Sequence, residues 1–97
     1  MIDLTKLEEF DWDTGNIHKN WIKHGVDNKE CEEIFNNEPL LILPDNIHSQ
    51  VEERYHALGK TNNGRLLFAA FTFRNNKVRI ISARKMSNKE KKIYEQK

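Results

Sequence analysis

The sequence predicts an α+β domain in which helices cover one face of an antiparallel sheet. Helix start and stop signals gather in residues 13–39, and apolar runs joined by short turns follow in residues 40–84. A further helix signal comes after residue 84. Helices followed by a sheet and one more helix form the element order of an α+β sandwich. A length of 97 residues suits a single domain over residues 1–97. We expect residues 1–9 to be a frayed extension.

The N-terminal part predicts a short strand and a first helix. Residues 10–12 alternate apolar and polar side chains, which favours a strand. Asp13 can cap a following helix, and Gly25 can end it. Trp12 and Trp21 are large and apolar, so we expect them to anchor the core rather than to stack on bases.

A second helix is predicted from residue 27 onward. Asp27 and Glu30 have the spacing of a capping box, and Pro39 closes the segment. The apolar stripe of this helix consists of Cys31, Ile34 and Phe35. Cys31 is the only cysteine, so the chain cannot form an internal disulfide, and we expect Cys31 to be a small packing residue.

Strand signals dominate the second half of the chain. Asn63-Gly64 and Asn75-Asn76 separate apolar runs in the manner of tight hairpin turns. The predicted strands are residues 40–43, 52–59, 65–73 and 78–84. After them, Ser87 and Glu90 form a capping box that opens a basic C-terminal helix within residues 85–97.

Two-residue loops at both turns would fix which side chains share a face of the sheet. The second turn would then pair Leu67 with Arg84, and the first would pair His56 with Phe71 and direct His56 into the core. The predicted core face holds Leu58, Leu67, Ala69, Phe71, Phe73, Val78 and Ile80. The opposite face would carry Glu53, Tyr55, Ala57, Ala70, Thr72, Arg79, Ile81 and Ala83.

Charge is distributed unevenly along the chain. Residues 1–50 hold four Lys/Arg and eleven Asp/Glu, a net −7, whereas residues 51–97 hold twelve and four, a net +8. The basic half suggests an anionic partner. The alternative is ordinary surface charge that is only solvated. No secretory signal or membrane-length apolar run is visible, so we expect a cytoplasmic protein that does not enter a membrane.

An acid, a phenol and a guanidinium on one sheet face suit chemistry on phosphate. Cleavage of RNA requires removal of the 2′-OH proton and stabilisation of extra negative charge on the phosphorus centre. Glu53 and His24 are the candidate bases, and both stay open. Arg54, Arg79 and Arg84 are the candidate phosphate clamps. The histidines lack metal-ligand spacing, so we expect neither a metal nor a cofactor.

Six segments of the chain resemble a known family in sequence and in order. They are Phe10-Asp11-Trp12-Asp13, Lys23-His24-Gly25-Val26, Glu52-Glu53-Arg54-Tyr55 with Ala57-Leu58-Gly59, Gly64-Arg65-Leu66-Leu67, Arg79-Ile80-Ile81-Ser82-Ala83-Arg84-Lys85, and Glu90 with Tyr94. On these residues the chain resembles the BrnT toxins, ribonucleases of bacterial toxin–antitoxin modules with a RelE-like fold. The family often has an aliphatic residue where His56 stands.

The resemblance implies a type II toxin that cleaves RNA, without a metal, and inhibits translation. It also implies a BrnA-like, DNA-binding antitoxin, a heterotetramer of two toxins and two antitoxins, and contact with operator DNA only through the antitoxin. The implied catalytic residues are Glu53, Arg79, Arg84, His24 and Lys23. The implied RNA-binding residues are Arg54, Tyr55, Arg65 and Lys85. The alternative is a non-catalytic RNA- or antitoxin-binding module, or an inactive toxin relic.

Overall fold

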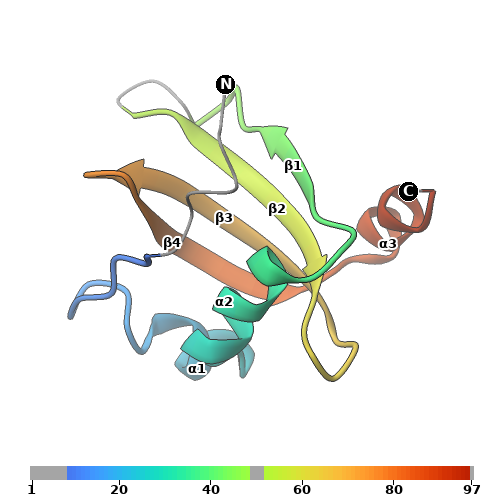
Figure 1. Cartoon of the computed structure of the whole chain (residues 1–97), viewed down its shortest axis with the longest axis horizontal. Helices are drawn as coiled ribbons and strands as arrows, with labels where there is room; N and C mark the ends of the chain where they lie inside the picture. Colours follow the sequence, from blue (N-terminus) through green and yellow to red (C-terminus); the bar gives the residue numbers. More distant parts are fainter. Residues whose placement is uncertain (1–8, 49–51, 97) are drawn as a thin grey trace.

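The computed structural model describes residues 9–48 and 52–96 and shows an antiparallel sheet with helices packed against it. The elements in chain order are α1 (Lys19–His24), α2 (Asn28–Asn36), β1 (Leu41–Pro44), β2 (Arg54–Lys60), β3 (Leu66–Arg74), β4 (Lys77–Lys85) and α3 (Asn88–Glu95). The strands lie in the order β1-β2-β3-β4, so neighbours in sequence are neighbours in the sheet. Figure 1 shows α1 and α2 on one side of this meander and α3 near the end of β2, which it contacts. The predicted α+β class with an antiparallel sheet is confirmed. The prediction that the helices cover one face is wrong, because Tyr94 of α3 packs with Leu58 and Phe68 on the face opposite α2.

Both predicted capping boxes are present. The Asp27 carboxylate accepts the Glu30 N–H at 2.7 Å, and Glu30 accepts the Asp27 N–H at 3.2 Å. Ser87 and Glu90 repeat the arrangement at the start of α3. These local bonds satisfy N–H groups that the first helical turn leaves unpaired, which explains why α2 and α3 begin where the sequence indicates. Across residues 9–48 and 52–96, no helix has the length and apolarity needed to cross a membrane.

The segment before α1 differs from its prediction. Asp13 caps a turn rather than the helix, because its carboxylate accepts the Gly15 N–H at 2.8 Å and α1 begins only at Lys19. Phe10 forms a single parallel bridge with Val78 instead of a strand. The prediction for residues 1–9 lies outside the described residues, except that the Glu9 carbonyl accepts the Val78 N–H at 3.1 Å.

The register of β3 against β4 is partly as predicted. Asn75 and Asn76 have φ of 52° and 65°, and the two-residue turn pairs Phe73 with Val78. A register shift then follows between Ala70 and Phe71, which leaves Ile81 without an opposite residue. The predicted pairing of Leu67 with Arg84 is therefore wrong.

Beyond the shift, Arg84 lies opposite Phe68 and Ala83 lies opposite Ala69. Ala83 consequently joins the core, so the prediction that it lies on the opposite face is wrong. A bulge adds one residue to one strand and so exchanges the faces of the residues that follow it.

The predicted register of β2 against β3 is wrong by one residue. Lys60 pairs with Leu66 across a five-residue loop, in which the Gly64 N–H donates to the Thr61 carbonyl at 2.9 Å. The two-residue turn at Asn63-Gly64 does not form. Because side chains alternate along a strand, this slip moves every β2 side chain to the other face of the sheet.

The slip has visible consequences in the packing. Tyr55 lies opposite Phe71, and both Tyr55 and Ala57 pack in the main core beneath α2. His56 lies opposite Ala70 on the other face, so the prediction that it faces the core is wrong. Leu58 belongs to a second cluster with Met86 and Tyr94, not to the main core. We call the side of the sheet under α2 the helix face, and the other side the outer face.

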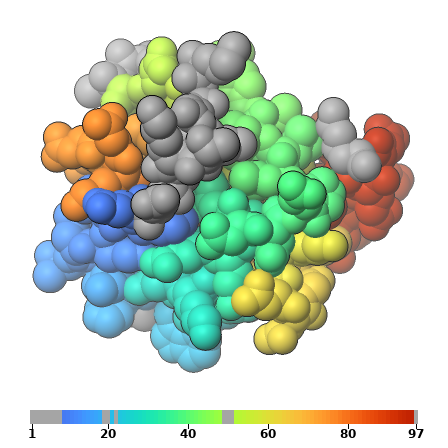
Figure 2. Space-filling model, viewed as in Figure 1, coloured from blue at the N-terminus to red at the C-terminus, as the bar shows by residue number. Residues whose placement is uncertain are grey.

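The main core lies between the helix face and α2. Its buried members are Val26, Cys31, Ile34, Ala57, Leu67, Ala69, Phe71, Val78, Ile80 and Ala83. Figure 2 shows α2 spread over the middle of this face. Trp12 packs against the core and donates from Nε1 to Glu32 at 2.8 Å. Trp21 is 63% exposed, so the prediction that it anchors the core is wrong.

Candidate functional site

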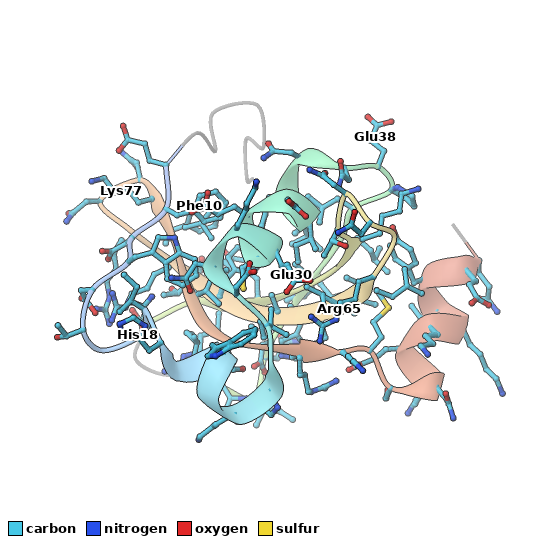
Figure 3. All side chains as sticks on the ribbon, turned by 90° about the horizontal axis from the view of Figure 1, so that it is seen from below. Phe10, His18, Glu30, Glu38, Arg65 and Lys77 are labelled. Carbon is cyan, nitrogen blue, oxygen red and sulfur yellow. The ribbon has the colours of Figure 1, made fainter. Side chains whose placement is uncertain are left out.

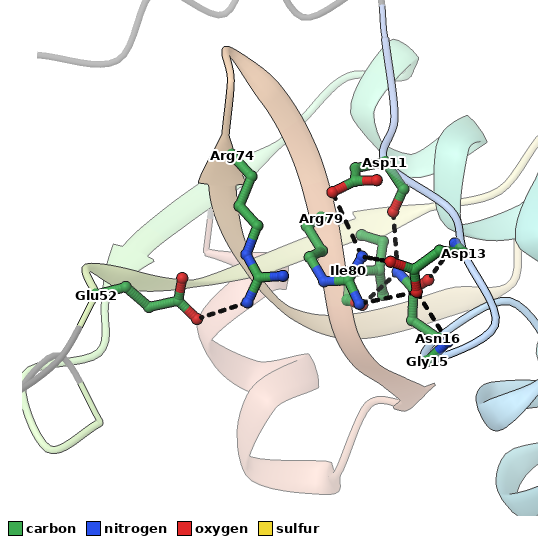
Figure 4. Close-up of polar contacts among 8 residues, drawn as sticks. All are labelled: Asp11, Asp13, Gly15, Asn16, Glu52, Arg74, Arg79 and Ile80. Atoms are coloured by element: carbon green, nitrogen blue, oxygen red, sulfur yellow. Dashed lines mark hydrogen bonds and ion pairs between the residues drawn. The ribbon is translucent and has the colours of Figure 1, made fainter.

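Three arginines gather at the end of the sheet where β2 and β4 begin and β3 ends. Arg54, Arg74 and Arg79 form this group, which we call the arginine cluster. Thr72 of β3 pairs with Arg54 of β2 on one side and with Arg79 of β4 on the other. One oxygen of Glu52 lies 3.9 Å from Arg54 and 3.6 Å from Arg74. The cluster therefore holds an anionic oxygen near two guanidinium groups. Figure 4 shows the contact of Glu52 with Arg74.

Arg79 is turned toward the segment that precedes α1. Its guanidinium contacts Asp13 at 2.9 and 3.0 Å and Asp11 at 3.3 Å, and its side chain is only 13% exposed (Figure 4). The hydrogen bond from Arg79 lowers the pKa of Asp13, and the same bond raises the pKa of Arg79. Arg79 thus fastens residues 11–13 to β4, and a phosphate oxygen would have to exchange with a carboxylate oxygen there.

Glu53 lies beside the cluster but on the helix-face side of β2. Its carboxylate accepts the Tyr55 hydroxyl at 2.8 Å, and the Tyr55 ring packs against Phe71 and Phe73. This hydrogen bond, with burial, raises the pKa of Tyr55, so the phenol stays protonated. The predicted grouping of Glu53, Tyr55 and Arg79 on one sheet face does not occur, because the register differs by one residue.

Arg84 lies at the other end of β4, on the outer face. Its guanidinium sits 4.1 Å from the centre of the Phe68 ring and donates to both oxygens of Glu90, at 2.7 and 2.9 Å. Five residues at about 3.3 Å each separate it from Arg79, roughly 16 Å along the strand. The structure therefore does not place Arg79 and Arg84 side by side. Lys85 lies opposite Leu67 and is exposed.

The remaining predicted site residues lie near α1. Lys23 and His24 are exposed in its last turn. Arg65 donates to the carbonyl of Gly25, which follows His24, at 3.0 Å. It also donates to both oxygens of Glu30, at 3.0 and 3.1 Å. Figure 3 shows Arg65 beside Glu30. These bonds join the β2–β3 loop to α2, which is a structural task for Arg65.

A hydrogen-bonded group around Asp45 was not predicted from the sequence. This carboxylate, 6% exposed, accepts from Nδ1 of His48 at 2.8 Å and from Nε2 of His56 at 2.9 Å. Sequence spacing could suggest only Asp45 and His48, because the contact with His56 depends on the β1–β2 pairing of Leu43 with His56. Nowhere in the two described ranges do three or more His, Cys, Asp or Glu residues form a group able to hold a metal ion.

The outer face arranges these groups in successive rows across the strands. One row contains Arg54, Thr72 and Arg79; the next contains His56, Ala70 and Ser82; the third contains Leu58, Phe68 and Arg84. The middle row has small side chains apart from the imidazole. Cations on both sides of a row of small residues can hold a chain of phosphates, because guanidinium groups bind phosphate oxygens through paired N–H donors.

Arginines arrayed on the sheet of a small α+β fold are suited to binding an anionic partner such as RNA. A family model described as "Ribonuclease toxin, BrnT, of type II toxin-antitoxin system" matches residues 12–90. The chain belongs to the BrnT family of ribonuclease toxins, since the match covers more than half of its 97 residues. No curated protein matches the chain. Family membership implies an RNA target and an antitoxin partner, and the resemblance drawn from the sequence is confirmed.

Proposed function

We propose that the chain is a metal-independent endoribonuclease that cleaves RNA by attack of a ribose 2′-OH on the adjacent phosphorus and thereby inhibits translation. The observation that carries this proposal is the array of Arg54, Arg79 and Arg84 around the row of small residues on the outer face. Guanidinium groups stabilise the extra negative charge of the phosphorane, and the attacking oxygen belongs to the substrate.

The arginines act in different ways in this proposal. Arg54 and Arg84 contact phosphates, with Lys85 adding positive charge at the end of β4. Arg79 holds residues 11–13 in place and can contact a phosphate only when its ion pair with Asp13 breaks. Two further sets of roles remain predictions from the sequence. They are catalysis by Glu53, Lys23 and His24, and RNA contact by Tyr55 and Arg65.

The proposed partner is a BrnA-like antitoxin with its own DNA-binding domain. Two toxins and two antitoxins would form the complex, operator DNA would be contacted only through the antitoxin, and the toxin would act in the cytoplasm. A RelE-like classification belongs to the same proposal. The opposite net charges of residues 1–50 and 51–97 would favour an antitoxin that carries a charged segment.

The test is cleavage of a defined RNA oligonucleotide by the purified chain in the presence of EDTA. Transesterification predicts one product with a 2′,3′-cyclic phosphate and one with a 5′-hydroxyl, and no product when the scissile ribose lacks its 2′-OH. The double variant Arg79→Ala/Arg84→Ala should cleave at least about 100-fold more slowly, because charge stabilisation is lost.

A matched control is Lys77→Ala, which also removes a cation from β4. Lys77 pairs with Glu9 at 3.5 Å at the turn end of the strand, so its loss should leave cleavage unchanged. Cleavage that EDTA abolishes, or that the double variant retains, would contradict the proposal. RNA binding without any product would favour the non-catalytic module instead.

A further inference from the structure

The most specific polar arrangement that the reaction above leaves unused is the group of Asp45, His48 and His56. Burial of the Asp45 carboxyl opposes its ionisation, but hydrogen bonds from His48 and His56 outweigh this effect and lower its pKa. Asp45 is therefore ionised near neutral pH. Its backbone N–H also donates to the Arg54 carbonyl at 2.9 Å, which fixes its position against β2.

The ionised carboxylate determines which ring nitrogen of His56 carries hydrogen. A carboxylate only accepts hydrogen bonds, so Nε2 of His56 must be the donor in the 2.9 Å contact. In the neutral ring, Nδ1 then holds the free lone pair. Within the described part of the chain, no group donates to Nδ1. A carboxylate that fixes one imidazole nitrogen and leaves the other open is the arrangement that orients a histidine base.

The position of His56 places its ring among the arginine-containing rows of the outer face. His56 follows Arg54 by two residues on β2, so both side chains lie on the outer face, about 7 Å apart along the strand. Its ring lies 4.8 Å from the Phe68 ring, over which Arg84 sits at 4.1 Å. The His56 side chain is 32% exposed and lies in the same row as Ala70 and Ser82.

We propose that His56 is the general base of the cleavage reaction and that Asp45 is its positioning residue. This inference rests on the proposed function. Nδ1 of His56 takes the proton of the 2′-OH as that oxygen bonds to phosphorus. The bond from phosphorus to the 5′ oxygen breaks, and the 5′ oxygen gains a proton from water. The imidazolium then returns its proton to solvent, so atoms and charge balance.

Two features separate His56 from Glu53, the base that the sequence suggested. The Glu53 carboxylate accepts a hydrogen bond from Tyr55 and lies on the helix-face side of β2, whereas His56 lies among the outer-face arginines. A carboxylate beside guanidinium groups also loses basicity. His48 contacts the same Asp45 oxygen but stands in the loop after β1, which makes it a matched control for the loss of one imidazole.

The experiment measures single-turnover cleavage of the same RNA oligonucleotide by His56→Gln, His48→Gln and Glu53→Gln. General base catalysis contributes about 100-fold or more, so His56→Gln should slow cleavage by at least that factor. His48→Gln should cleave within about threefold of wild type. Glu53→Gln removes the competing base, and a loss larger than that of His56→Gln would overturn the inference. Added imidazole should restore cleavage to His56→Ala, an effect that a structural role for His56 would not produce.

Each outcome decides between the alternatives. If wild type yields no product, both the proposed function and this inference fail. If wild type cleaves and His56→Gln cleaves equally well, only the inference fails. A slow His56→Ala variant that imidazole does not rescue assigns His56 a structural role and also overturns the inference. The affinity of each variant for uncleaved RNA with a 2′-deoxy scissile site, measured in parallel, should remain unchanged.

Discussion

Two nitrogens of Arg84 donate to the two oxygens of Glu90, at 2.7 and 2.9 Å, and so join the end of β4 to the first turn of α3. Glu90 Oε1 also accepts the Ser87 N–H at 2.8 Å, so one carboxylate serves both as a helix cap and as an ion-pair partner. A residue that the family resemblance assigns to activity therefore has a structural role as well, and variants of Arg84 need a stability measurement beside the cleavage assay.

The first prediction concerns the stability that Glu90 provides. The hydrogen bond from Arg84 lowers the pKa of Glu90. A carboxyl with a lower pKa in the folded state stabilises the fold above its ordinary pKa of about 4.3, and this contribution is lost as pH falls through the folded value. Glu90→Gln should reduce the free energy of unfolding by about 1 kcal/mol at pH 7, because the cap and ion pair weaken.

Urea unfolding of both proteins at pH 7 and pH 3 measures this effect. The difference between wild type and Glu90→Gln should shrink at pH 3. Glu95→Gln is the control, because Glu95 lies in the last turn of the same helix and takes no part in the cap. An equal loss for Glu95→Gln, or a difference that does not depend on pH, would contradict the assignment.

The second prediction concerns the close approach of β2 to α2. A Cβ added at Gly59 would lie 2.9 Å from the Ile34 Cβ and 3.0 Å from the Ile34 carbonyl oxygen. Neither atom belongs to a flexible side-chain end. Gly59→Ala should therefore lower the free energy of unfolding by about 1–3 kcal/mol, the usual cost of overpacking.

Gly64→Ala provides the comparison, because a Cβ there meets nothing within 4 Å but the backbone has a φ of +82°. Its cost, about 1 kcal/mol, comes from the backbone alone. Pairing Gly59→Ala with Ile34→Val leaves the Ile34 Cβ in place and should not restore stability. Thermal unfolding measures all three, and a neutral Gly59→Ala would show that α2 can move away from β2.

The third prediction concerns the reactivity of Cys31. Burial, with the nearby carboxylates of Asp27, Glu30 and Glu32, raises the pKa of its thiol to about 12. Since the thiolate is the reactive form, the native protein should react with a disulfide reagent only through unfolding. Labelling at pH 8 should be slow in buffer and immediate in denaturant. Fast labelling of the native protein would mean that the helix face opens more readily than the packing indicates.

The fourth prediction separates two roles for Arg65. Its bonds to Glu30 and to the Gly25 carbonyl join the β2–β3 loop to the start of α2. Arg65→Ala should lower the free energy of unfolding by about 1–2 kcal/mol, because hydrogen bonds between charged groups are lost. Glu30→Gln removes the same ion pair from the other side without removing a cation.

RNA affinity distinguishes the roles. If Arg65 is structural, Arg65→Ala and Glu30→Gln should bind RNA as tightly as wild type below their unfolding temperatures. A salt-dependent loss of affinity in Arg65→Ala alone would support the RNA contact that the family resemblance implies. A double-mutant cycle between the two positions measures the coupling of the pair in either case.

Local signals in the sequence determined much of the secondary structure. The capping boxes at Asp27 and Ser87 begin α2 and α3, and Gly25, with a φ of +65°, follows the end of α1. Each is a contact between residues three or four apart, or the conformation of one residue. Such features depend on nearest neighbours, so a reader of the sequence can find them. The family was also accessible, because its matching segments run through the chain in order.

Only the tertiary structure decided which side chains share a face. The five-residue loop before Leu66 and the register shift at Ile81 each change the pairing by one residue. A change of one residue places a side chain on the other face of the sheet. The turn residues alone do not reveal the length of the loop or the presence of the bulge, because both are properties of the pairing of whole strands. For that reason the sequence named Glu53 and Arg79 as neighbours, whereas the fold brings His56 to Asp45.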